Sequence, residues 1–157
     1  MKLLFKQRVF SWLDSYDIYN EHDEVMFIVK GKLAWGHKLL IYTPDGEEVG
    51  EVSEHVMTWL PKFHLIEHGV EVGMIQKELT FLRPKFHLTC NDWEVNGNMW
   101  EWDYEVSSPT RGHIMFVTQE IFHFADTYVL DIKEEEDILR CLMIVLAIDA
   151  AKCSQNT

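Results

Sequence analysis

The chain has 157 residues, of which 47% are hydrophobic and 13% aromatic, a composition that excludes a generally disordered protein. It carries 14 Lys and Arg against 26 Asp and Glu, and the formal net charge of -12 opposes binding to nucleic acid. The length predicts one domain over residues 1–157, and three cysteines without C-x-x-C spacing indicate reduced thiols and a cytoplasmic location.

Residues 3–132 are predicted to form about twelve β-strands joined by turns. The first strand is expected within Leu3–Phe10, and β-branched and aromatic runs such as Val25–Val29 and His37–Thr43 follow. Clusters of Asn, Asp and Gly separate these runs, which is typical of hairpins. In Pro44-Asp45-Gly46, proline fixes one turn angle and glycine supplies a positive φ.

A sequence repeat of 23 residues indicates that the hairpins share one plan. Pro61-Lys62-Phe63-His64-Leu65 recurs unchanged as Pro84-Lys85-Phe86-His87-Leu88. Repeats of this length bury their apolar faces only collectively. We therefore expect a two-stranded hairpin repeated at least four times. The same spacing relates the predicted turn residues Asp23, Gly46, Gly69 and Asp92.

Trp100–Val106 alternates aromatic and acidic residues, which predicts a strand with one face on the core and one in water. An acidic cluster runs through this region, and carboxylates can bind a divalent cation or act as a general-acid pair. The alternation already explains every second residue, so we interpret the cluster as a solvated strand face, and the tryptophans as core. The cluster comprises Asp92, Glu94, Glu101, Asp103 and Glu105, and the tryptophans are Trp93, Trp100 and Trp102.

Residues 134–152 are predicted to form one helix. Four carboxylates, Glu134 to Asp137, suit a helix N-terminus, and Glu136 and Asp137 can each reach Arg140 one turn on. From Cys141 to Ile148 no residue is polar, so the helix lacks the polar face of a surface helix. A membrane span needs about 20 apolar residues, which favours a helix enclosed by protein.

The strands and the helix together predict the architecture. A helix about 10–12 Å across fits inside a barrel larger than eight strands and smaller than sixteen. We therefore predict a mainly β protein, a closed antiparallel barrel of about twelve strands wrapped around a central hydrophobic C-terminal helix.

The order of several motifs resembles the LURP-one-related family. These motifs are Val29-Lys30-Gly31-Lys32-Leu33, Ala125–Ile132 before an acidic link, and Leu146-Ala147-Ile148-Asp149 at the end of the apolar helix. The resemblance covers essentially the whole chain and implies the tubby C-terminal-like fold, a twelve-stranded barrel around a C-terminal helix. It also implies a distant relation to tubby proteins and phospholipid scramblases. Most members of this family have no assigned activity.

One catalytic motif requires consideration. His64-Leu65-Ile66-Glu67-His68 matches the H-x-x-E-H pattern of zinc peptidases, in which both histidines project from one helix. Here the repeat places Glu67-His68-Gly69 on a hairpin turn, which argues against a metal-dependent hydrolase. We interpret the histidines as strand-face or turn residues, and no metal, cofactor or catalytic residue is predicted. The histidines concerned are His55, His64, His68 and His87.

The remaining functional class is binding. Lys30, Lys32 and Lys38 form a basic cluster in an acidic chain, where Gly31 would let a headgroup approach the backbone. Tubby proteins bind phosphoinositides, so the resemblance implies an anion or a lipid headgroup as ligand, while the net charge favours a merely solvated hairpin. We predict a non-catalytic binding module or scaffold whose partner is a lipid or a protein, with peripheral membrane contact. Two alternatives stay open: a scramblase-like protein whose helix enters the bilayer, and an enzyme, such as a metal-dependent hydrolase, whose site the sequence does not reveal.

Overall fold

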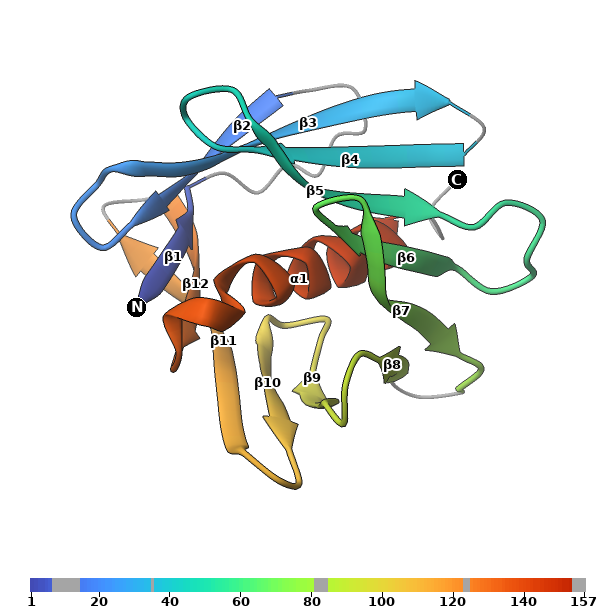
Figure 1. Ribbon diagram of the computed structural model, residues 1–157. Coiled ribbons are helices and arrows are strands. Elements are labelled where there is room, and N and C mark those ends of the chain that lie inside the picture. Colours follow the sequence, from blue (N-terminus) through green and yellow to red (C-terminus); the bar gives the residue numbers. More distant parts are fainter. Residues whose placement is uncertain (7–14, 35, 81–84, 123–124, 154–157) are drawn as a thin grey trace.

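Twelve strands form one antiparallel sheet that curls around a single C-terminal helix, α1 (Ile138–Cys153) (Figure 1). The computed structural model describes residues 1–6, 15–34, 36–80, 85–122 and 125–153. This arrangement confirms the predicted fold class. The strands are β1 (Lys2–Phe5), β2 (Ser15–Asn20), β3 (Val25–Ala34), β4 (Gly36–Tyr42), β5 (Glu48–Glu54), β6 (Lys62–Glu67), β7 (Val70–Glu78), β8 (Lys85–Thr89), β9 (Glu94–Asn98), β10 (Asp103–Ser108), β11 (Gly112–Phe122) and β12 (Ala125–Ile132).

The sheet is closed into a barrel except at one seam. β1 pairs with β12, and each strand pairs with the next in the chain, but β8 and β9 are not hydrogen-bonded to each other and form the two edges of the sheet. The predicted fourth hairpin, around Asp92, is therefore wrong. Its two strands, β8 and β9, are present but diverge and do not pair. The predicted strand Leu3–Phe10 is confirmed as far as Phe5, and its part at residues 7–14 lies outside the described residues.

The 23-residue repeat is visible in the turns. Asp23, Gly46 and Gly69 have φ values of 66°, 91° and 80° and lie in the β2–β3, β4–β5 and β6–β7 connections. His68 has a φ of 48°, so the two central residues of the β6–β7 turn both have positive φ, as a type I′ turn requires. The predicted spacing of hairpin turns is confirmed, and it places these turns at the same end of the barrel.

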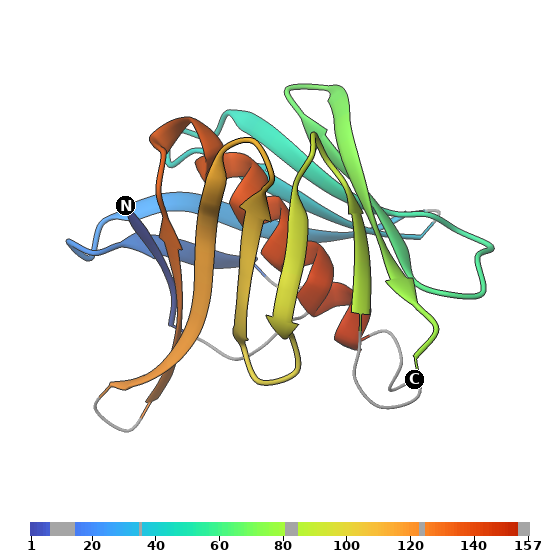
Figure 2. The same ribbon diagram turned by 90° about the horizontal axis from the view of Figure 1, so that it is seen from below.

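The two ends of the barrel carry different connections. We define the N-terminal end as the one where α1 begins and the C-terminal end as the one where α1 finishes. Because consecutive strands run in opposite directions, connections alternate between the ends. The repeat turns lie at the N-terminal end, and the β3–β4, β5–β6 and β9–β10 connections lie at the C-terminal end (Figure 2).

The predicted central helix is confirmed by its burial. Every residue from Cys141 to Ile148 is at most 2% exposed, so the barrel wall covers this part of α1, about two helical turns, on all sides. A 3-10 turn, η1 (Glu135–Asp137), precedes the helix. No helix among the described residues is long and apolar enough to cross a membrane.

Charged residues tie α1 to the barrel through partners that differ from the predicted ones. Arg140 does not pair along the helix with Glu136 or Asp137, because its Nε donates to Glu67 Oε2 on β6 at 2.8 Å. The Asp137 side chain is 5% exposed and accepts hydrogen bonds from both terminal nitrogens of the Arg111 guanidinium, with N···O distances of 3.2 and 2.7 Å. These hydrogen bonds raise the pKa of both arginines. Long-range ion pairs therefore fix the start of the helix.

The predicted strand over Trp100–Val106 is wrong at its beginning. β10 starts at Asp103, and residues 99–102 form the β9–β10 turn, in which Trp102 has a φ of 53°. Reversal of the chain breaks the alternation, so Trp100 is 48% exposed rather than in the core. Trp93 and Trp102 are buried as predicted.

Candidate functional site

The three predicted binding lysines lie together on the outer surface of the barrel. Lys32 on β3 is directly opposite Lys38 on β4, and Lys30 lies two residues away on the same face of β3. Lys30 and Lys32 are exposed, whereas Lys38 is half-buried and forms an ion pair with Glu51 at 3.1 Å. The structure therefore gathers the cluster, with two of its three ammonium groups turned to solvent.

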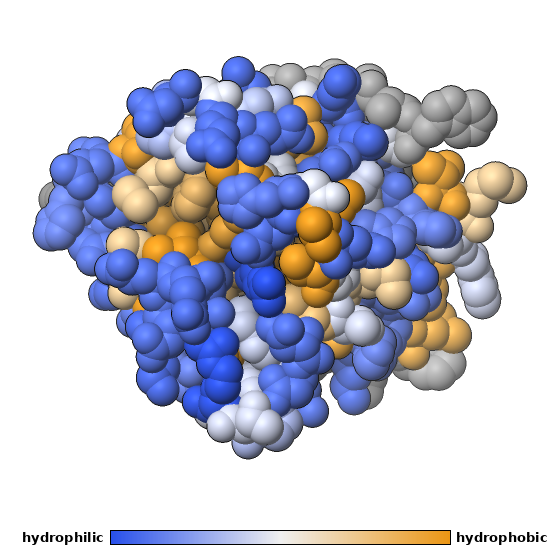
Figure 3. Space-filling view, viewed as in Figure 1, coloured by the Kyte–Doolittle hydropathy of each residue, from blue (hydrophilic) through white to orange (hydrophobic). Residues whose placement is uncertain are grey.

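The β5–β6 loop projects apolar side chains beside this cluster. Met57 is 97% exposed and Trp59 88% exposed, and Figure 3 shows hydrophobic atoms over this loop at the right edge of the molecule. The loop is a defined structure, since the Thr58 hydroxyl donates to the Leu60 carbonyl at 2.9 Å. Single exposed apolar residues are ordinary, but an exposed tryptophan and methionine on one short loop are typical of a contact surface.

The loop and the lysine cluster form one surface near the C-terminal end. A Cβ on Gly36, the first residue of β4, would lie only 2.9 Å from a Val56 methyl group, so the start of β4 contacts the β5–β6 loop. Lys62 opens β6 on the same outward face. It lies two strands from Lys38 and two residues along, or about 12 Å away. We name this set the lysine–tryptophan surface. It comprises Lys30, Lys32, Lys38, Met57, Trp59 and Lys62.

Acidic residues gather in the connections at the N-terminal end of the barrel. Ten carboxylates lie in the connections of the N-terminal end, on the opposite side from the lysine–tryptophan surface. Two acidic side chains beside the surface are engaged, because Glu51 binds Lys38 and Glu54 binds His37 Nδ1 at 2.7 Å. These ten carboxylates therefore lie away from the lysines. The ten are Glu21, Asp23, Glu24, Asp45, Glu47, Asp92, Glu134, Glu135, Glu136 and Asp137.

The histidines of the zinc-peptidase motif do not meet. His64 lies within β6, while His68 lies in the β6–β7 turn, so the two do not project from one helical face. His64 Nε2 is instead 2.9 Å from His55 Nδ1, and its Nδ1 contacts Glu71. In the described part of the chain, no three His, Cys, Asp or Glu side chains are arranged to hold a metal ion.

The acidic cluster is dispersed. Asp92 lies at the N-terminal end of the barrel and Glu101 in the β9–β10 turn at the other end. Asp92 accepts hydrogen bonds from Thr110 and Ser108, which lower its pKa and explain its position without a ligand. Asp103 points to solvent on β10, as the prediction of a solvated strand face requires.

Sequence reasoning missed Met57, Trp59 and Lys62. A signal was present, because counting the hairpins assigns alternate connections to the same end of a barrel. The β3–β4 lysines and the β5–β6 loop could thus have been placed together. The exposure of Trp59 could not have been predicted, since a tryptophan in a short loop packs inward as readily as outward.

Comparison with known proteins agrees with the fold. The model of a family described as LURP-one-related matches residues 1–149. An uncharacterized protein of Bacillus subtilis, YxjI, is 28% identical over 150 residues, which cover 95% of this chain and 92% of YxjI. The X-ray structure of an Arabidopsis thaliana protein, AT5G01750, superposes with a TM-score of 0.59 at 13% identity, covering 92% of this chain and 88% of the plant chain. That likeness concerns the tubby-like fold alone.

Proposed function

The chain belongs to the LURP-one-related family, and within this tubby-like fold we propose that it is a non-catalytic binding module that docks on anionic lipid surfaces. The lysine–tryptophan surface makes the contact. One observation carries the proposal: exposed apolar side chains, Met57 and Trp59, project beside exposed lysines at the end of the barrel opposite the acidic connections.

Charge distribution supports an anionic surface as the ligand. The net charge of -12 repels anions at long range, but ionic screening limits this repulsion to about 8 Å at physiological ionic strength. A bilayer that meets the lysine–tryptophan surface faces Lys30, Lys32 and Lys62, while the ten carboxylates at the N-terminal end point away. Each lysine close to an anionic bilayer contributes about 1 kcal/mol.

The apolar loop supports a lipid surface over a free anion. Tryptophan is favoured at membrane interfaces, where its ring lies among headgroups and its indole N–H remains hydrated. Methionine is flexible and adapts to irregular apolar surroundings. A soluble phosphate compound would engage the lysines but leave Met57 and Trp59 exposed. The proposed site is therefore a peripheral membrane contact, with α1 remaining inside the barrel.

Vesicle sedimentation tests the proposal. We expect the purified protein to sediment with vesicles of phosphatidylcholine and phosphatidylserine at low salt, and less at high salt. Substituting Lys30, Lys32 and Lys62 with Gln together removes about 3 kcal/mol, or roughly a hundredfold in affinity. Trp59→Ala should weaken binding without changing the salt dependence.

A matched control separates the site from general charge. Lys133→Gln changes one exposed lysine at the N-terminal end of the barrel and should leave vesicle binding unchanged. Surface substitutions of this kind typically change stability by under about 0.5 kcal/mol, so all variants should unfold like the wild type. Equal binding of the triple variant and the wild type would refute the proposal.

A further inference from the structure

The seam between β8 and β9 exposes two sheet edges to one cleft. β8 is hydrogen-bonded to β7 and β9 to β10, and no strand of the described ranges lies on the other side of either. In an antiparallel ladder, alternate residues direct both backbone groups away from the partner strand. Two or three residues of each five-residue strand therefore present N–H and C=O groups to the seam. Such edges are ready to pair with another chain.

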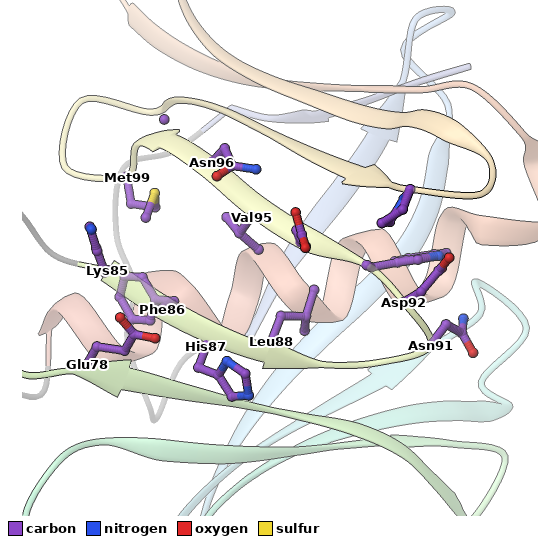
Figure 4. Close-up of a pocket in the computed structure, with 14 residues that line it drawn as sticks. Glu78, Lys85, Phe86, His87, Leu88, Asn91, Asp92, Val95, Asn96 and Met99 are labelled. Carbon is purple, nitrogen blue, oxygen red and sulfur yellow. The ribbon is translucent and has the colours of Figure 1, made fainter.

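The cleft has the dimensions and lining of a binding site. Its volume is about 580 Å³, within the range of ligand sites. Figure 4 shows the side chains of Leu88 and Val95 pointing from the two strands into the space between them, with α1 behind. Phe86 and Met99 continue this apolar floor. An entering chain would find backbone partners on both sides and an apolar surface beneath.

A buried donor at the cleft lacks a partner. Trp93 lines the cleft and is 2% exposed, and its Nε1–H has no acceptor among the described residues. Buried indole N–H groups usually have a partner.

The rim of the cleft selects for charge. Among the described residues, three exposed carboxylates border it, Glu78, Asp92 and Glu94, against one lysine, Lys85. The rim therefore favours a positively charged occupant. The cleft lies between two short strand edges of five residues each, which suits a single extended chain.

We propose that the seam binds a basic, extended peptide segment of a partner protein, which adds as a strand between β8 and β9. Since β8 and β9 run in opposite directions, the added strand lies antiparallel to one edge and parallel to the other. Its apolar residues alternate onto the floor, and its lysine or arginine side chains lie along the acidic rim. Backbone pairing supplies affinity and the alternate side chains supply specificity.

Synthetic peptides test this inference on the full chain. The probes are capped seven-residue peptides that alternate lysine with valine, leucine or phenylalanine, and a matched series has glutamate in place of lysine. We expect basic peptides to bind at least tenfold more tightly than acidic ones in fluorescence anisotropy. Glu78→Lys with Glu94→Lys should reverse this preference, while Glu47→Lys, at an exposed turn elsewhere, should not.

Two further measurements identify strand addition. Methylation of a central amide nitrogen of the peptide should abolish binding, whereas methylation of its first residue should change affinity less than twofold. Hydrogen exchange should slow at amides of β8 and β9 when the peptide binds. The inference is overturned if no basic peptide binds at millimolar concentration, if central methylation has no effect, or if protection appears elsewhere. The Lys30, Lys32 and Lys62 variant should bind the peptide normally, because this site is independent of the lipid surface.

Discussion

Leu146→Asp tests whether the buried helix holds the barrel together. Leu146 is 2% exposed, and its neighbours from Cys141 to Ile148 are apolar and buried. The new carboxyl must lose its charge to stay there, which costs about 4 kcal/mol at pH 7, given an ordinary pKa near 3.9 and 1.36 kcal/mol per unit. Loss of the leucine packing adds about 2–5 kcal/mol. The sum approaches the typical total stability of about 5–15 kcal/mol.

Urea unfolding followed by circular dichroism measures this effect, with Leu146→Asn as a polar control that does not titrate. Burial holds the pKa of the new carboxyl above its unfolded value, so the Asp variant gains stability relative to the Asn variant as pH falls. The gain should be about 1.4 kcal/mol per unit from pH 7 toward pH 4 and should level off below that. Leu146→Met should cost less than about 1.5 kcal/mol. Unfolding of Leu146→Asp at wild-type urea concentrations would refute the enclosed helix.

Three further predictions concern the barrel. Arg111→Met leaves the buried Asp137 unpaired and should lower the urea midpoint of unfolding, whereas Arg111→Met with Asp137→Leu should recover most of that loss. An equal loss in both variants would contradict the ion pair. Gly73→Ala places a Cβ 2.4 Å from a carbonyl oxygen of β8, so chemical denaturation should show a loss of about 1–3 kcal/mol or more. Burial raises the pKa of the Cys90 and Cys141 thiols. Iodoacetamide at pH 7 should therefore leave both unmodified, as judged by peptide mapping, until urea unfolds the chain. Rapid modification of the folded protein would contradict their burial.

Much of the fold could be predicted because its signals are local. The unbroken apolar run of α1 required an enclosure, and the turn residues at Asp23, Gly46 and Gly69 fixed where hairpins reverse. Strand number and helix diameter then led to the barrel. Each of these inferences depends on residues near one another in the chain or on a simple count.

The errors concern contacts between distant residues. Arg140 has carboxylates one turn away, yet it pairs with Glu67, because the barrel brings β6 against the helix. The seam at β8 and β9 was invisible, since both strands have ordinary sequences and their separation depends on how twelve strands close around α1. Trp100 alternates with acidic residues in sequence, but the chain reverses there and turns it outward.

Site-specific fluorescence tests the central claim, that the C-terminal end of the barrel docks on anionic lipid. A solvent-sensitive dye attached at Met57→Cys, in a Cys153→Ser background, should shift to shorter emission wavelengths when phosphatidylserine vesicles are added. The same dye at Asp45→Cys, in an exposed turn at the N-terminal end, should not shift. An unchanged spectrum at position 57, or equal shifts at both positions, would contradict the proposed membrane contact.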